Sequence, residues 1–110
     1  MLNFAGVVLA FGLVLPGVVA AEAAQDMIAE CEACHGPGGV STVADTPSLA
    51  GDGVAYLRKL LDEFTFYERH CTLTSYRYGD RPKTPTNMCN VANSLSDEEK
   101  QAVAEYFANQ

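Results

Sequence analysis

Cys31, Cys34 and His35 are the residues of this chain whose types and spacing could do chemistry together. The two cysteines are three positions apart and the histidine follows directly, which gives the pattern Cys-x-x-Cys-His. On one helical turn both thiols can add to the two vinyl groups of a porphyrin, and the adjacent imidazole can bind its iron. The pattern therefore predicts one covalently attached haem of the c type, with His35 as an iron ligand.

Two other kinds of site use the same cysteine spacing. A thioredoxin-like redox pair would need a strand-turn-helix setting, and a zinc site would need a second pair of ligands at metal-binding spacing. The remaining cysteines, Cys71 and Cys89, are eighteen positions apart and supply such a pair poorly. Haem attachment is the preferred interpretation, and the thiol and zinc sites are the alternatives.

A helix over residues 24–35 would present the motif. Met27, Ile28 and Cys31 fall on one side of this helix, and Cys34 continues the same stripe. The Gly-Pro-Gly-Gly sequence at 36–39 ends it, because glycine tolerates positive φ and proline lacks an N–H. Residues 40–51 are polar and contain proline and glycine, so we expect an ordered loop there.

Two more helices are indicated further along the chain. The first has Asp52 as its expected N-cap and carries apolar side chains at i, i+3, i+4 and i+7. The second begins at a capping box formed by Ser96 and Glu99. The side chains expected in the core are Tyr56, Leu57, Leu60, Leu61 and Phe64 from the first helix, and Val103, Tyr106 and Phe107 from the second.

Residues 65–87 show no sustained period, which predicts a loop with room for one short helix. Within it, residues 66–83 combine aromatic side chains with arginine and lysine. We expect an ordinary solvated loop whose aromatic rings pack onto the domain. A docking surface for another protein is the alternative.

Residues 1–21 contain no charged side chain and include an apolar run at 7–15, closed by Pro16 and Gly17. This is typical of a secretory signal peptide, with a cleavage site that is uncertain between residues 20 and 23. An uncleaved membrane anchor is the alternative, because residues 4–21 are nearly long enough to cross a bilayer.

The charge of the chain limits its partners. It has 7 Lys and Arg against 14 Asp and Glu, a formal net charge of −7. Such a surface repels nucleic acid and anionic lipid and favours a protein partner with a basic docking face. Contact with a membrane is expected only if the N-terminal segment is retained.

Taken in order, the motifs resemble those of bacterial class I cytochromes c. The resemblance rests on Cys-x-x-Cys-His-Gly at 31–36, Thr-Pro-Ser-Leu-Ala-Gly at 46–51, Met88, and Leu-Ser-Asp-Glu-Glu at 95–99 leading into the last helix. It covers nearly all of residues 22–110. It implies a small all-α cytochrome c domain over 22–110, built around one covalent haem c, with its first and last helices crossing beside the haem edge.

The resemblance also implies the surroundings of the iron. His35 would be one ligand, with the carbonyl of Pro47 against its other ring nitrogen, a contact that orients the imidazole. The family places a methionine ligand where Met88 lies, and His70 is the alternative iron ligand. Met27 lies on the same helix as Cys31 and cannot reach the other haem face, so it is expected to fill the core.

Cys71 and Cys89 depart from the plain family pattern. They flank the loop before the last helices, and Cys89 directly follows Met88. Haem thioethers are made outside the cytoplasm, so we expect a periplasmic protein whose remaining thiols form a disulfide. The bridge would stabilise the fold by about 3 kcal/mol by constraining the unfolded chain, and would hold the Met88 loop. Buried free thiols are the alternative.

Histidine and methionine ligands together saturate the iron and raise its potential, which suits electron transfer rather than catalysis. We therefore expect a periplasmic monohaem electron carrier that is not itself an enzyme. A narrower likeness is to the cytochrome subunits of flavocytochrome c sulfide dehydrogenases. In that case the partner would be a flavoprotein with a basic or apolar docking face. The alternative function is a haem-based sensor or small-ligand binder, which would need a labile or absent sixth ligand.

Overall fold

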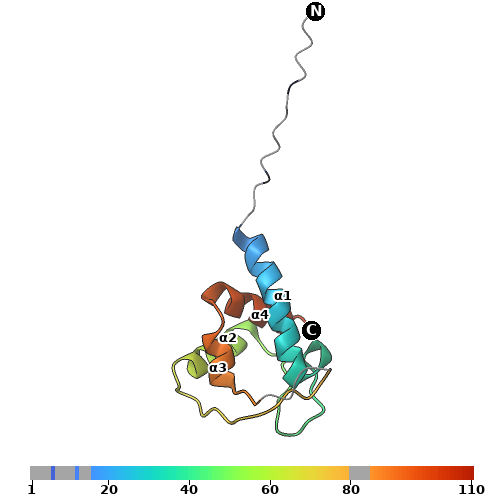
Figure 1. The fold of residues 1–110 in the computed structure, drawn as a ribbon, viewed down its shortest axis with the longest axis vertical. Coiled ribbons are helices and arrows are strands. Elements are labelled where there is room, and N and C mark those ends of the chain that lie inside the picture. Colours follow the sequence, from blue (N-terminus) through green and yellow to red (C-terminus); the bar gives the residue numbers. More distant parts are fainter. Residues whose placement is uncertain (1–5, 7–11, 13–15, 80–84) are drawn as a thin grey trace, which may run out of the picture.

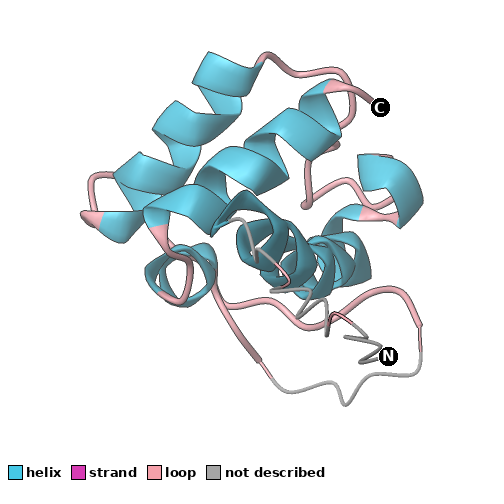
Figure 2. Ribbon diagram, turned by 90° about the horizontal axis from the view of Figure 1, so that it is seen from above, coloured by secondary structure: helices cyan, strands magenta, loops and turns pink. Residues whose placement is uncertain are grey.

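The computed structural model describes residues 6, 12, 16–79 and 85–110, with side chains from Ala24 onward. Its helices are α1 (Pro16–His35), the short 3-10 helix η1 (Pro37–Gly39), α2 (Val54–Thr65), α3 (Met88–Asn93) and α4 (Asp97–Ala108). Helices joined by loops make up the described residues, without a strand (Figures 1 and 2). The prediction of an all-α fold is confirmed.

The core forms where α1, α2 and α4 meet. Leu57 of α2 and Val103, Ala104 and Phe107 of α4 form one buried cluster, against which Met27, Ile28 and Cys31 of α1 pack. The predicted apolar stripe of α1 thus lies against α4. The first and last α-helices of the domain therefore pack against each other (Figure 1). Because Cys31 takes part in this contact, the contact also helps to set the position of the Cys-x-x-Cys-His motif.

The first helix begins earlier than the sequence predicted. It starts at Pro16 rather than at Ala24, because the alanine-rich residues before Ala24 favour helix. Residues 1–5, 7–11 and 13–15 of the predicted signal peptide lie outside the described residues, and both the peptide and its cleavage site stay predictions. In the part of the chain that is described, no helix has the length and apolar character needed to cross a membrane.

The predicted N-cap of the second helix is wrong. The helix is preceded by Gly53, which makes no side-chain capping bond. Asp52 lies one residue further out, where its N–H donates to the carbonyl of Leu49 at 3.3 Å. The Arg58 guanidinium joins this helix to α4, donating to the backbone oxygen and the carboxylate of Asp97, both at 2.8 Å.

The capping box at the start of α4 is confirmed. The Glu99 N–H donates to the Ser96 hydroxyl at 3.1 Å, and the Ser96 N–H donates to the Glu99 carboxylate at 2.9 Å. Helix α3 has its own cap, the Asn87 side chain, which accepts from the Asn90 N–H at 2.9 Å. The boundaries of α3 were not predicted, because six residues hold too little periodic pattern.

Residues 66–79 run without a helix, and residues 80–84 lie outside the described part of the chain. Thr74 and Thr86 form an isolated antiparallel bridge. The expectation that the aromatic rings here pack onto the domain is wrong for Phe66 and Tyr67, whose residues are 69% and 72% exposed. Tyr56, expected in the core, is 53% exposed. It falls one position before the buried Leu57, on the exposed side of α2.

Candidate haem site

A cavity of about 390 Å³ lies between the end of α1, the 45–49 loop, α2 and α3. The predicted haem residues Cys31, Cys34, His35, Pro47 and Met88 all line it, although they come from three separate segments. Much of the remaining wall is apolar, formed by side chains that include Leu57, Leu60, Leu61, Phe64, Val103 and Phe107. This combination fits a large apolar ring that is anchored at one edge and bound on its iron.

His35 is held in one orientation at the wall of the cavity. Its Nδ1–H donates to the carbonyl oxygen of Pro47 at 2.6 Å, so the Nε2 lone pair is left for a metal. His35 is 7% exposed. Burial lowers the pKa of its imidazole, and the hydrogen bond to Pro47 opposes this effect in part. The lowered pKa favours the neutral imidazole, which is the form that binds iron.

The turn after α1 fixes the position of Pro47. The carbonyl of Gly39 accepts from the N–H groups of Leu49 at 2.7 Å and Ala50 at 3.1 Å, which ties the 45–49 loop to η1. Gly39 has φ +79°, and a Cβ there would lie 2.6 Å from the Phe107 ring. Only glycine allows η1 to approach α4 this closely, so this one position links the core to the His35–Pro47 contact.

The two motif cysteines have the properties of buried thiols rather than of a redox pair. Burial, then the charge of Glu30, raises the pKa of Cys31 to about 12. Burial also raises the pKa of Cys34. Reactive Cys-x-x-Cys pairs have lowered thiol pKa values instead. A zinc site completed by the other cysteines does not form either, because Cys71 and Cys89 are bonded to each other.

Of the three candidate sixth ligands, Met88 lies best for the role. It is the first residue of α3, lines the cavity, and packs beside the buried cluster of Leu61, Ala92 and Leu95. His70 also lines the cavity, but the residue is exposed on the loop. Met27 packs against the core, where it was expected to fill space.

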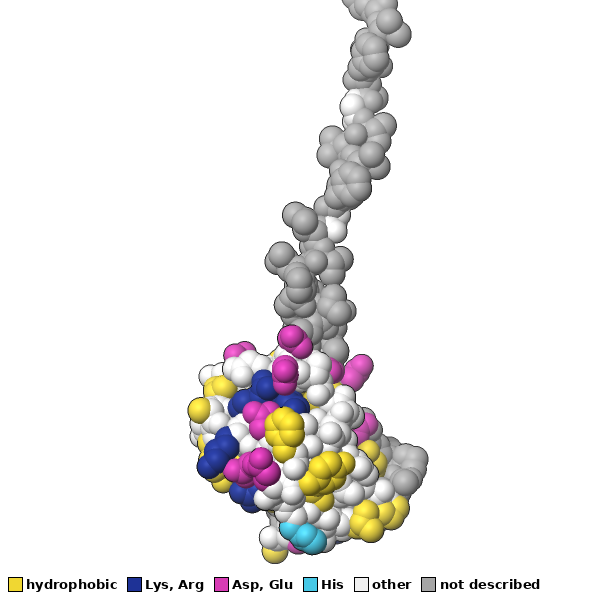
Figure 3. Space-filling model, turned by 90° about the vertical axis from the view of Figure 1, so that its left-hand side faces the viewer, with side chains coloured by type: hydrophobic (Ala, Val, Ile, Leu, Met, Phe, Trp, Pro, Cys, Tyr) yellow, Lys and Arg dark blue, Asp and Glu magenta, His cyan; other side chains and the backbone are white. Residues whose placement is uncertain are grey.

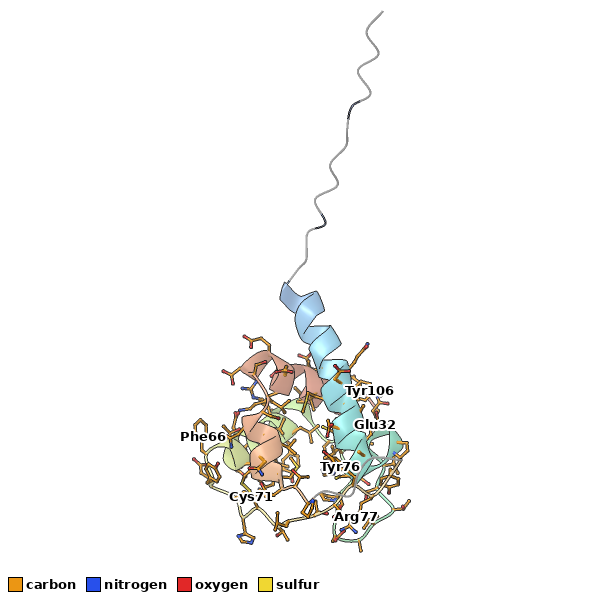
Figure 4. The ribbon with its side chains drawn as sticks, viewed as in Figure 1. Glu32, Phe66, Cys71, Tyr76, Arg77 and Tyr106 are labelled. Carbon is orange, nitrogen blue, oxygen red and sulfur yellow. A yellow bond between two sulfur atoms is a disulfide. The ribbon has the colours of Figure 1, made fainter. Side chains whose placement is uncertain are left out.

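The disulfide joins the loop to the helix that carries Met88. Cys71 and Cys89 are bonded, with their Cα atoms 5.8 Å apart. Cys71 follows His70 on the loop (Figure 4), and Cys89, which is 2% exposed, is the second residue of α3. The bridge therefore fixes the chain on both sides of the 72–88 segment, next to Met88.

The 74–78 segment contacts the haem motif in a way the sequence did not reveal. The N–H groups of Arg77 and Tyr78 both donate to the carbonyl of Ala33, at 2.7 and 3.0 Å. The Tyr76 hydroxyl donates to the Glu30 carboxylate at 2.7 Å, and both residues line the cavity. No periodic pattern signals this packing, because it depends on a loop meeting a distant helix.

Comparison with known proteins identifies the family. The family model for cytochrome c matches residues 20–110, most of the chain. The chain belongs to the cytochrome c family. Covalently bound haem c is the cofactor of this family, and the single Cys-x-x-Cys-His motif of the chain provides for one haem. The domain is an electron-carrying monohaem cytochrome c domain rather than a catalytic one.

Several curated relatives support the same family. The cytochrome c domain is 42% identical over 83 residues to the "Thiosulfate dehydrogenase electron acceptor" of Stutzerimonas stutzeri, covering 74% of this chain and 33% of that protein. It is 33% identical over 97 residues to a cytochrome c4 of Stutzerimonas stutzeri, covering 82% of this chain and 40% of the relative. The chain thus spans well under half the length of these two relatives.

A third relative is close to this chain in size. The cytochrome c-554(548) of Halomonas halodenitrificans is 31% identical over 91 residues, which cover 82% of this chain and 95% of the relative. A cytochrome c can therefore consist of little more than a domain of this length.

Proposed function

We propose that this cytochrome c is a periplasmic single-electron carrier in which Cys31 and Cys34 hold the haem and His35 and Met88 bind its iron. The observation that carries the proposal is the shared cavity, in which the buried His35 has its Nδ1–H bonded to Pro47. When bound, the haem supplies a one-electron iron couple. The residues of the chain decide how that couple is held and which molecules reach it.

The surrounding side chains have separate tasks in this proposal. The Pro47 carbonyl keeps the imidazole of His35 in one tautomer and orientation. Met88 would supply the second protein ligand to the iron, which would raise the potential and leave no iron position for substrate. The apolar wall formed by residues such as Leu61 and Phe64 excludes water, which would otherwise stabilise the more highly charged oxidised state.

A periplasmic location is supported by two features. Residues 1–21 have the composition of a signal peptide. Cys71 and Cys89 are bonded, and disulfides persist in oxidising compartments. Expression of the full chain with fractionation of the cells, followed by mass determination of the exported haem protein, tests the location and the cleavage site together.

The proposed electron donor is an enzyme that oxidises reduced sulfur compounds. The 42% identical relative is named as an electron acceptor of thiosulfate dehydrogenase, which supports a thiosulfate dehydrogenase as donor. The second candidate is a flavoprotein sulfide dehydrogenase, which rests on the likeness of the sequence to its cytochrome subunits. Both candidates deliver electrons to an acceptor of this kind.

Stopped-flow spectroscopy separates the two donors. Oxidised protein is mixed with thiosulfate and purified thiosulfate dehydrogenase, or with sulfide and purified flavoprotein sulfide dehydrogenase, and reduction is followed by haem absorbance. Controls omit each enzyme, since sulfide reduces haem directly. We expect catalysed reduction with the thiosulfate enzyme. Faster catalysed reduction with the flavoprotein alone would assign that donor instead.

The sensor function is tested by adding carbon monoxide to the ferrous protein. A carrier with Met88 on the iron should show an unchanged spectrum. Rapid formation of a carbon monoxide complex would favour the sensor, because it requires an open or easily displaced iron position.

A further inference from the structure

Two exposed aromatic residues follow one another at the end of α2. Phe66 and Tyr67 are 69% and 72% exposed, and neither lines the haem cavity, so a bound haem would not cover them. Phe66 lies at the outer side of the molecule in Figure 4, and Figure 3 shows that apolar side chains lie among charged ones on this face. We call these two residues the aromatic pair.

Tyr67 has an unfavourable backbone conformation for its residue type. Among the described residues it is the only non-glycine with positive φ, at 56°. It ends α2 in a Schellman motif, in which the Glu68 N–H donates to the Glu63 carbonyl at 2.9 Å and the Tyr67 N–H donates to the Phe64 carbonyl at 3.3 Å. Glycine is preferred at this position because a Cβ is strained there.

In the free protein, burial of the Tyr67 side chain does not offset this strain. The Tyr67 ring is exposed, and the apolar contact that often supports such a motif is replaced here by Glu63 and Glu68. A glycine would serve the helix end better. An exposed aromatic side chain kept in a strained conformation is more typical of a binding surface than of a structural position.

The aromatic pair lies close to the haem cavity. Phe64, on the preceding turn, lines the cavity, and the Arg69 guanidinium lies 5.7 Å from the centre of its ring. A surface hollow of about 470 Å³ is lined by Tyr67, Arg69, His70 and the Cys71–Cys89 bridge. A protein seated on the pair would thus be separated from the haem by few side chains, on the side of Met88.

The charges around the pair indicate the kind of partner. Glu63 forms ion pairs with Lys59 at 3.8 Å and with Arg69 at 3.1 Å, and Arg58 forms one with Asp62. The cations beside the pair are thus compensated locally, while the chain as a whole carries −7. An acidic molecule with a neutral apolar contact area attracts a positively charged protein from a distance and binds it by apolar contact. A second copy of this chain would be repelled.

We propose that Phe66 and Tyr67 form the docking site for the redox partner, a protein of positive net charge with an apolar contact surface. This inference rests on the proposed electron-transfer function. One electron passes between the two docked proteins, so that one is oxidised as the other is reduced, and no bond is made or broken. Burial of the pair in the complex offsets the strain at Tyr67.

The test compares Phe66→Ser and Tyr67→Gly with the control Tyr56→Ser, which removes an exposed tyrosine from the opposite end of α2. The probe is a basic soluble c-type cytochrome of higher potential, mixed in its oxidised form with the reduced protein in a stopped-flow instrument. We expect the second-order rate to fall about fivefold to tenfold in each pair variant. The control should match the unmodified protein.

Thermal unfolding gives a second, independent measurement. Tyr67→Gly should raise the melting temperature while it slows electron exchange, a combination that a merely structural role of Tyr67 would not produce. Unchanged exchange rates in both pair variants would overturn the docking site, and a lower melting temperature of Tyr67→Gly would overturn the strain argument. Conversion of a dimer to a monomer by these variants would assign the surface to a second copy.

The failure of the docking site can be told apart from failure of the proposed function. If the unmodified protein binds carbon monoxide or is reduced by neither sulfur enzyme, the carrier function or its donor is wrong. If it passes those tests and exchanges electrons with the basic probe as fast as its pair variants do, only the docking site is wrong. Reduction by ascorbate and the haem spectrum should be the same in all variants, which shows that the haem site is intact.

Discussion

Met88 and His70 are both near the cavity, but their surroundings differ. Met88 begins a helix and packs beside Leu61, Ala92 and Leu95, whereas His70 is exposed on a loop. A side chain held by packing loses little further entropy on binding iron. An exposed one must be ordered first. The position of Met88 therefore favours it as the ligand.

Replacement of Met88 by alanine should remove the weak far-red sulfur-to-iron absorption band of the oxidised protein and lower the reduction potential, because a thioether stabilises the reduced iron. The matched variant is His70→Ala, which should leave both unchanged. Visible spectroscopy and a redox titration measure the two effects. The reverse pattern would make His70 the ligand.

At the scale of elements, helix ends set the geometry of the site. Helix α4 begins with a reciprocal cap between Ser96 and Glu99, whereas α2 begins at Gly53 without a side-chain cap. Phe107, near the other end of α4, lies against Gly39 and so supports the loop that carries Pro47. A side-chain cap therefore stabilises the start of α4 but not the start of α2.

Ser96→Ala should lower the free energy of unfolding by about 1 kcal/mol, because it removes the acceptor of the Glu99 N–H. Asp52→Ala should change it by less than about 0.5 kcal/mol, because Asp52 is not the cap of α2. Urea unfolding of the haem-loaded protein, followed by circular dichroism, measures both. An equal loss in the two variants would mean that Asp52 has a capping role after all.

The disulfide connects the loop to α3 and acts on both stability and ligation. Replacing Cys71 and Cys89 by serine should lower the free energy of unfolding by about 3 kcal/mol, since the unfolded chain regains the freedom of that loop. It should also make Met88 easier to displace by added imidazole. Thermal unfolding and imidazole titration give the two results. Serine variants as stable and as resistant as the original protein would show that the bridge does not clamp the loop.

At the scale of the whole molecule, the net charge of −7 governs encounter with other proteins. The attraction of a basic partner is screened beyond about 10 Å at 0.1 M salt. A freely diffusing carrier should therefore lose exchange rate steeply as salt rises, while a permanent subunit should stay associated through apolar contact.

Size-exclusion chromatography of a native extract at low and high salt, with stopped-flow rates at the same salt concentrations, tests these alternatives. We expect a haem peak at monomer size and a rate that falls with salt, the behaviour of a free carrier. A stable larger species that contains flavin at both salt concentrations would instead identify the protein as a permanent subunit of a flavoprotein complex.

The amino-acid sequence alone determined those features that depend on neighbouring residues. The spacing of Cys31, Cys34 and His35 predicted the cofactor, and the Ser96–Glu99 box predicted the start of the last helix, because each pattern lies within a single helical turn. Tertiary structure decided the features that need distant segments. The exposure of Phe66 and Tyr67 and the contact of Tyr76 with Glu30 depend on which surfaces meet, and no local period records that.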